Sequence, residues 1–171
     1  MAQAPEVRLL MVILDQAYDH PSWHGTNLRG SIRRVSPKQA AWRPALSEVE
    51  GPAPRRHNIW ELVVHAAYWK YSVWRRLTGQ SRGSFPLTGS NWFPRPQELT
   101  ERAWRSDKAL LDQMHGSLRE AVGHLSPRDL QWKPRGSKVS NFALLSGVAA
   151  HDLYHAGQIQ LLKRLSARGF H

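Results

Sequence analysis

The chain has 171 residues, which is enough for one domain with a sizeable core and too few for two domains of ordinary size. Hydrophobic residues make up 41% of it and eight tryptophans are present, so the low hydrophobicity of a disordered chain is excluded. Cysteine is absent, and any metal site must therefore use histidine and carboxylate in place of thiolate. We expect a single folded domain over residues 1–171.

The balance of charge is strongly basic, with 24 lysines and arginines against 13 acidic residues and a net charge of +11. Such a charge raises the hypothesis of a nucleic-acid or anionic-surface partner. The basic residues are scattered as pairs, such as Arg33-Arg34 and Arg75-Arg76, with no long run and no groove-reading motif. We therefore favour a solvated basic surface over nucleic-acid binding.

The N-terminal apolar run covers only residues 9–14 and is followed by Asp15. It is too short for a signal segment or a membrane span. The sequence thus predicts a soluble, cytoplasmic protein with no membrane association.

Four long segments have the periodicity of amphipathic helices, and no run alternates as strands do. The first spans residues 5–18, with Pro5 in its first turn; its predicted buried face carries Leu9, Val12, Ile13 and Ala17. His20-Pro21 interrupts it, and residues 26–35 resume a helical pattern.

The second helix starts after Asn58, a good N-cap with Glu61 three residues on, and stops at Gly79. The third is expected from about residue 96 to 124, and the last from Ser140 or Asn141 to about Ala167. Four amphipathic helices of these lengths predict an all-α four-helix bundle.

An internal repeat supports two similar helix pairs, which a pseudo-twofold axis would relate. VSPKQAAWRP (35–44) matches LSPRDLQWKP (125–134), and each has a Ser-Pro start to a short turn and a tryptophan anchor. Between the pairs, residues 79–96 are rich in Gly, Pro and Ser and long enough to run the length of a bundle. We expect a long crossover or lid between the second and third helices.

The last helix carries the sequence's clearest chemical signal. On a helical wheel, one narrow stripe holds both histidines of the pair His151 and His155, so the two imidazoles point inward. Residues four apart lie close enough on one face to bind a single ion. Asp152 adjoins the first histidine on the flank of the helix, where we expect a surface group or one that supports a ligand, not a general base.

A His-x-x-x-His pair is weak evidence for a metal site without a third ligand, because most such pairs are packed or exposed. The second helix offers His65, which lies near its middle as the pair lies near the middle of the last helix. Three neutral imidazoles would leave coordination positions for water or substrate. Zinc, nickel and iron all accept nitrogen ligands, and the residues do not choose among them.

Four blocks resemble one known family: AYDHPSWHGTNLRGSI (17–32), RHNIWELVVHAAYWK (56–70), GSFPLTGSNWFPRP (83–96) and HDLYHAGQIQLLKRL (151–165). Together they resemble the DinB-like superfamily of metal-dependent hydrolases, over nearly the whole chain. The resemblance implies a bundle with up-down-down-up topology and a divalent metal, commonly nickel or zinc, held by His65, His151 and His155. Some members are transferases or isomerases that use bacillithiol, mycothiol or glutathione, so it also implies a low-molecular-weight thiol.

Further residues are candidates for a pocket beside the histidines, although surface exposure or packing explains each of them equally well. They are Tyr18, His24, Asn27, Tyr68 and Gln158. Trp92 and Phe93, in the crossover, are placed to close over an apolar substrate.

Three functions remain open. The first is a metal-dependent enzyme that activates a thiol for attack on a small-molecule electrophile, and the second is a metal-dependent hydrolase that activates water. The third is a non-enzymatic, stress-related or DNA-associated binding module, in which the histidines only stabilise the bundle. Homodimer formation is compatible with each of them.

Overall fold

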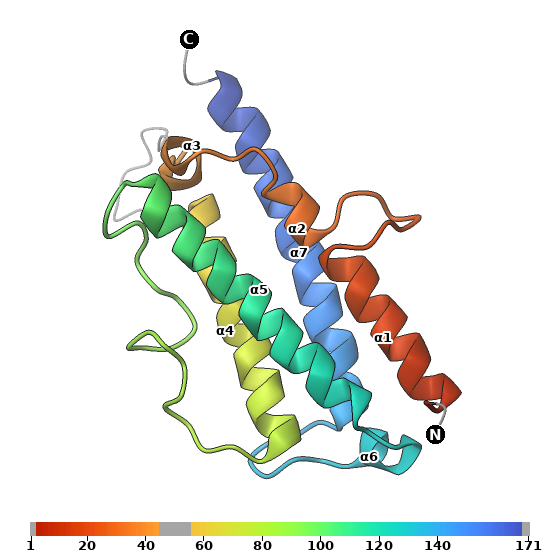
Figure 1. Cartoon of the computed structure of the whole chain (residues 1–171). Coiled ribbons are helices and arrows are strands. Elements are labelled where there is room, and N and C mark those ends of the chain that lie inside the picture. Colours follow the sequence, from red (N-terminus) through yellow and green to blue (C-terminus); the bar gives the residue numbers. More distant parts are fainter. Residues whose placement is uncertain (1–2, 45–55, 169–171) are drawn as a thin grey trace, which may run out of the picture.

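The computed structural model describes residues 3–44 and 56–168, and over these residues all regular structure is helical. The helices are α1 (Pro5–Tyr18), α2 (Leu28–Ser31), α3 (Pro37–Ala41), α4 (Ile59–Thr78), α5 (Glu101–Gly123), α6 (Pro127–Gln131) and α7 (Asn141–Arg168). Figure 1 shows the four long helices packed along one another, with α1 and α7 running upward and α4 and α5 downward. The all-helical bundle that the sequence predicts is confirmed. Among the described residues, no helix is long and apolar enough to cross a membrane.

The ends of α4 lie where the sequence predicts them. Asn58 and Glu61 form a capping box, in which the Asn58 side chain accepts from the Glu61 backbone NH at 2.8 Å. At the other end Gly79 adopts φ +71°, a conformation that favours glycine. The start of α5 is later than predicted, at residue 101, because the Thr100 hydroxyl caps the helix by accepting from the Ala103 NH at 3.1 Å.

The predicted buried face of α1 is wrong in three of its four positions. Leu9, Val12 and Ile13 are 64%, 45% and 48% exposed, and only Ala17 is buried as expected. The helix instead buries Val7, Leu10, Leu14, Asp15, Ala17 and Tyr18. Apolar residues occur all around α1, so periodicity alone does not choose the face that packs on α5 and α7.

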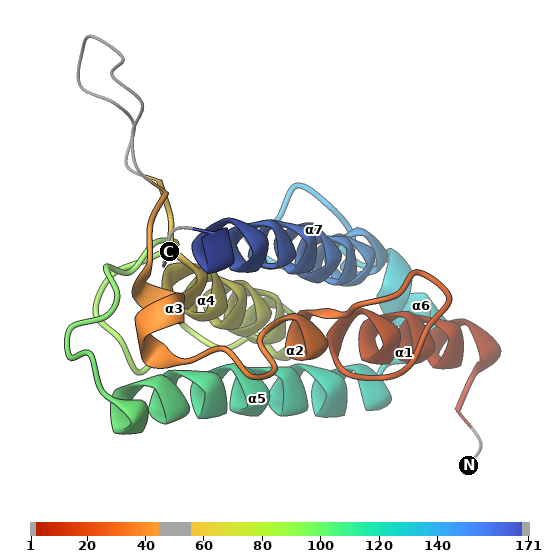
Figure 2. The ribbon, with the colours of Figure 1, turned by 90° about the horizontal axis from the view of Figure 1, so that it is seen from above.

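The short helices α2 and α3 complete the layer that α1 begins. At 14 residues, α1 is about 21 Å long, half the length of the 28-residue α7. Figure 2 shows α2 and α3 lying beyond α1 along the remaining length of the bundle. Because α2 has only four residues, residues 26–35 contain a single helical turn. The Asn27 side chain caps this turn by accepting from the Gly30 NH.

The internal repeat of the sequence is a repeated local structure. Ser36 caps α3 and Ser126 caps α6, and both short helices begin with proline. Each ends at a tryptophan with nearly the same backbone angles, Trp42 and Trp132. Trp132 is 68% exposed, however, so the expectation that it anchors its turn is wrong.

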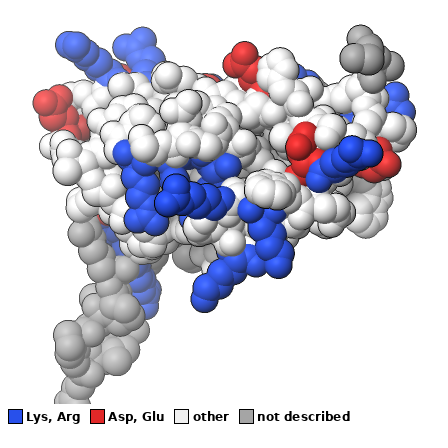
Figure 3. All heavy atoms as spheres, turned by 90° about the horizontal axis from the view of Figure 1, so that it is seen from below, with Lys and Arg blue, Asp and Glu red and all other residues white. Residues whose placement is uncertain are grey.

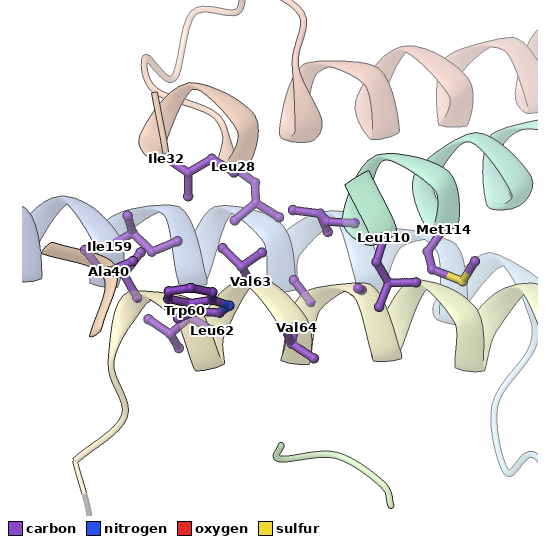
Figure 4. Packing of buried hydrophobic residues seen from close by; sticks show 14 of the residues in the cluster. Leu28, Ile32, Ala40, Trp60, Leu62, Val63, Val64, Leu110, Met114 and Ile159 are labelled. Carbon is purple, nitrogen blue, oxygen red and sulfur yellow. The ribbon is translucent and has the colours of Figure 1, made fainter. Parts of the chain in front are cut away.

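Two clusters of buried apolar side chains fill the bundle. The larger joins α2, α3, α4 and α5, and Figure 4 shows Leu28 of α2 pointing toward Val63 of α4 within it. The second joins α1, α6 and the first half of α7 to the last turns of α5. Trp60 and Trp104 are fully buried in the larger cluster with ring centroids 5.0 Å apart, and the Trp60 Nε1 donates to Asp107 at 2.7 Å.

A buried charged network crosses the bundle between helices. Lys70 of α4 and Asp152 of α7 are both fully buried, and the Lys70 ammonium donates to the Asp152 carboxylate. The same ammonium lies 3.3 Å from Nδ1 of His115 on α5 and 4.8 Å from the ring centroid of Tyr18 on α1. All four long helices therefore contribute to this network. Asp152 is not on the surface, which corrects one of the two alternatives that the sequence leaves open.

Glu61 ties the start of α4 to the segments around it, and it gives the fold a specific acid sensitivity. Its carboxylate is 2% exposed and accepts two hydrogen bonds from Arg43 and one from His57. Burial raises the pKa of Glu61, but the hydrogen bonds from Arg43 and His57 outweigh burial and lower it from 4.5 to about 2.

We expect this carboxylate to contribute about 3 kcal/mol of stability above pH 4.5, all of which is lost as the pH falls to about 2. The sign follows because the unfolded chain binds the proton more tightly than the folded one. Urea unfolding of the wild type and of Glu61→Gln, across this pH range, measures the effect. The stability gap between the two proteins narrows toward low pH; a constant gap would contradict the assignment.

Candidate metal centre

Three histidines meet at the middle of the bundle, on the facing sides of α4 and α7. The Nε2 atom of His151 lies 3.0 Å from Nε2 of His65 and 3.0 Å from Nε2 of His155. His65 and His155 are 5% and 3% exposed, and His151 is half-buried. Among the described residues these three form a cluster able to hold a metal ion, which brings together the residues that the sequence selected.

The outward nitrogens of two of these rings fix the state of the inward ones. Nδ1 of His65 lies 2.8 Å from the backbone oxygen of Asn91, which can only accept, so this Nδ1 carries the proton. Nδ1 of His155 donates in the same way to the Gln158 side-chain oxygen at 2.6 Å. The Nε2 atoms of both neutral rings therefore present lone pairs to the centre of the cluster. Ligand histidines in proteins are held by this type of outward hydrogen bond.

The cluster fits a small divalent ion better than it fits a proton. A tetrahedral zinc with bonds of about 2.0–2.1 Å keeps its nitrogen ligands about 3.3 Å apart, close to the two separations of 3.0 Å at His151, and the three ligand atoms lie within 4.8 Å of one another. A proton on His151 satisfies one facing lone pair at a time, whereas an ion satisfies all three nitrogens. Nδ1 of His151 is buried without a partner among the described residues, so no neighbouring group there fixes its tautomer.

Burial keeps the imidazoles neutral, as metal ligands must be. It lowers the pKa of His65 to about 4, and the pKa of His151 to about 3 with help from the charge of His155. Burial also lowers the pKa of His155, against the hydrogen bond to Gln158. At neutral pH the three imidazoles are therefore uncharged, so almost no proton has to leave before a cation binds.

An aromatic side chain from the crossover covers the cluster. The Trp92 ring stacks on His65 at 3.8 Å and, with its other face, on His57 at 3.5 Å. The expectation that Trp92 lies over the site agrees with this position. Phe93 is instead a core residue, 3% exposed and packed on Phe85 and Tyr68.

Two cavities reach the histidines. One, of about 560 Å³, lies between α4 and α7 and includes His65, His151 and Trp69 in its lining. The other, of about 580 Å³, is lined by His155, His57, Trp92 and Gln158 among others. Three nitrogen ligands with access to cavities of this size leave room for a small molecule at the ion.

The remaining pocket candidates divide into one that lies at the cluster and four that do not. Gln158 orients His155, as described above. Tyr18 is buried against His115 and donates to Asp112, and Tyr68 packs in the aromatic core beside Phe85. His24 is exposed and bonded to Ser22, while Asn27 is the cap of α2. These four residues belong to the sequence motifs quoted above, but tertiary packing directs their side chains away from the histidine cluster.

Asn91 is the site residue that sequence reasoning missed. It accepts from His65 through its backbone oxygen, and its side-chain oxygen accepts from Trp69 Nε1 at 2.9 Å. These two donors are four residues apart on α4 and so share one face. Asn91 adopts φ +63°, a conformation in which asparagine is over-represented. The GSN run that precedes Trp92 was the only signal for such a turn.

Comparison with known proteins identifies the family of this chain. The family model described as the DinB superfamily matches residues 22–159, which contain all three histidines, Asn91 and Trp92. Searches of curated proteins and of solved structures found nothing that matches the chain. The matched segment covers well over half of the sequence. The chain therefore belongs to the DinB superfamily.

Proposed function

We propose that this chain is a single-domain, up-down-down-up bundle and a metal-dependent enzyme, whose divalent ion is held by His65, His151 and His155. The observation that carries the proposal is the convergence of three Nε2 atoms with two Nδ1 protons bound outward to oxygen. Nitrogen ligands suit zinc and nickel, and iron is also accepted.

A bound ion of this kind lowers the pKa of a coordinated thiol or water, which becomes a nucleophile at neutral pH. The described residues of both cavities include no aspartate or glutamate, so no carboxylate there serves as a general base. That lining favours a thiol, which needs little help to lose its proton, over water. We therefore place transfer of a low-molecular-weight thiol to a small electrophile ahead of hydrolysis.

Metal content tests the site directly. We expect about one equivalent of transition metal per chain in untagged protein, and loss of that metal in His151→Ala. His155→Gln provides a second variant with a milder change of volume, and His24→Ala is the matched control because it removes an exposed histidine elsewhere. Folding of each variant is checked by circular dichroism. Metal retained in both site variants, or absent from the wild type after addition of zinc or nickel, would overturn the proposal.

Activity separates the two reactions. With monochlorobimane as electrophile, transfer forms a carbon–sulfur bond, releases chloride and requires an added thiol such as glutathione. Hydrolysis of nitrophenyl esters proceeds without thiol. Metal-dependent ester turnover with no thiol-dependent reaction would move hydrolysis ahead, and metal binding with neither reaction would favour a binding module.

A further inference from the structure

The cavity between α4 and α7 is a groove that runs along α4, away from the three histidines. Its α4 side consists of His65, Trp69, Val73 and Arg76, whose spacing places them on one helix face. Its α7 side includes Leu144, Gly147, Val148 and His151, and the loop of residues 136–139 closes one end. His65 and His151 therefore lie at one end of a largely apolar groove, and Arg76 lies toward the other.

The far end of the groove is cationic, and no residue that the structure describes supplies a compensating charge there. Among the described residues, Arg76 and Lys138 are the basic side chains that line it, and no carboxylate does. Arg76 also lines a neighbouring cavity of about 500 Å³ together with Arg75 and Arg82, and the described lining of that cavity likewise contains no carboxylate. Figure 3 views this end of the bundle and shows lysine and arginine side chains gathered over it.

The Arg76 guanidinium is held in place but has donors to spare. Its Nη1 donates to the backbone oxygen and hydroxyl of Ser72, one turn earlier on α4. Its Nε and Nη2 atoms have no partner among the described residues. None of the four basic side chains of the two cavities, Arg75, Arg76, Arg82 and Lys138, forms an ion pair with a described carboxylate. Burial, and then the charges of Arg75 and Arg82, lower the pKa of Arg76, so the cations repel one another. An anion at this position would relieve that repulsion and accept the free N–H groups.

We propose that the ligand of this groove is an elongated amphipathic carboxylate, whose anionic end binds Arg76 and Lys138 while its other end reaches the three histidines. The α4 positions of His65 and Arg76 are 11 residues apart, or about 16 Å along the helix axis. Trp69, Val73 and Val148 line the distance between them, which suits an apolar chain or ring in the middle of the ligand. This inference rests on the proposed metal site, since the ion anchors the far end.

The test uses zinc-loaded protein and a homologous series of alkyl hydroxamates that end either in a carboxylate or in its methyl ester. The hydroxamate binds the ion in both forms, and only the carboxylate can engage the cationic end. At the best chain length we expect the carboxylate to bind about tenfold more tightly than the ester, the factor for one charge-assisted hydrogen bond. Arg76→Gln should remove this preference, and Lys138→Gln should reduce it.

Arg105→Gln is the matched control, because Arg105 is an exposed arginine on α5 that lines neither cavity. Equal binding of carboxylate and ester at every chain length would overturn the anion site. An equal loss of the carboxylate preference in Arg105→Gln would also overturn it, because the preference would then come from the net charge of the protein alone. The methyl ester tests the metal site separately, because it cannot engage the cationic end. If binding of the ester does not depend on zinc, the proposed metal site is wrong, whatever the result with the carboxylate. Calorimetry at fixed ionic strength measures all of these affinities.

Discussion

Replacing Lys70 by methionine is expected to lower the free energy of unfolding by about 3–5 kcal/mol, because it leaves the Asp152 carboxylate buried without its counter-ion. The carboxylate's other oxygen already lacks a hydrogen bond from any described residue, so nothing at hand replaces the ammonium. Methionine retains much of the volume of lysine, and the loss therefore reports charge more than packing. Urea unfolding at neutral pH, in the presence of chelator, measures it.

The double variant Lys70→Met with Asp152→Leu separates charge from position. Both charges are then absent, and we expect most of the lost stability to return, since apolar pairs of similar volume often equal a buried ion pair. Arg29→Met is the control for an ion pair near the surface, with Asp112, and should cost about 1 kcal/mol or less. A double variant as unstable as Lys70→Met would show that the loss comes from packing and not from an unpaired carboxylate.

The buried pair also bears on how the metal centre is assembled. Lys70 lies five residues after His65 on α4, and Asp152 directly follows His151 on α7. The two helices run in opposite directions in Figure 1, so one contact between charges fixes how they align. Alignment at Lys70 and Asp152 thereby sets His65 level with about residue 157 of α7, within one helical turn of His155. We expect this buried pair to favour one register of the two helices that hold the histidines.

Local signals explain which parts of the fold were predictable. The ends of α4 depend on Asn58 and Gly79, which act within a few residues of their own position. The histidines of α7 share a face because of helical geometry alone, and His65 was placed by its position within a single helix. These inferences needed no knowledge of distant contacts, and the structure agrees with them.

The parts that sequence could not supply depend on contacts between distant residues. Asp152 is buried because Lys70, 82 residues away, accompanies it into the core. The buried face of α1 is chosen by packing on α5 and α7, since the helix has apolar residues on more than one side. Asn91 reaches His65 only because the crossover returns along α4. Composition and periodicity contain none of these pairings.

Removal of the metal is expected to produce the second large effect. If free zinc exceeds its dissociation constant about a thousandfold, binding adds about 4 kcal/mol to the stability of the folded state. For a domain of this size, that corresponds to a rise in Tm of roughly 10 °C between chelated and zinc-loaded protein. The physical source is the buried group of facing Nε2 lone pairs, which have no other way to be satisfied together. Thermal unfolding followed by circular dichroism at neutral pH, with and without chelator, measures the shift.

The control variants decide whether the shift arises at the three histidines. His155→Gln keeps a polar side chain of similar size but removes one ligand, so zinc should raise its Tm much less than it raises that of the wild type. His24→Ala removes an exposed histidine and should retain the full shift, because His24 lies outside the cluster. An equal zinc effect in all three proteins would assign the binding to surface histidines. A wild type that is indifferent to chelator would instead mean that the three imidazoles stabilise the bundle by packing alone, and that the metal-dependent reactions proposed above do not occur.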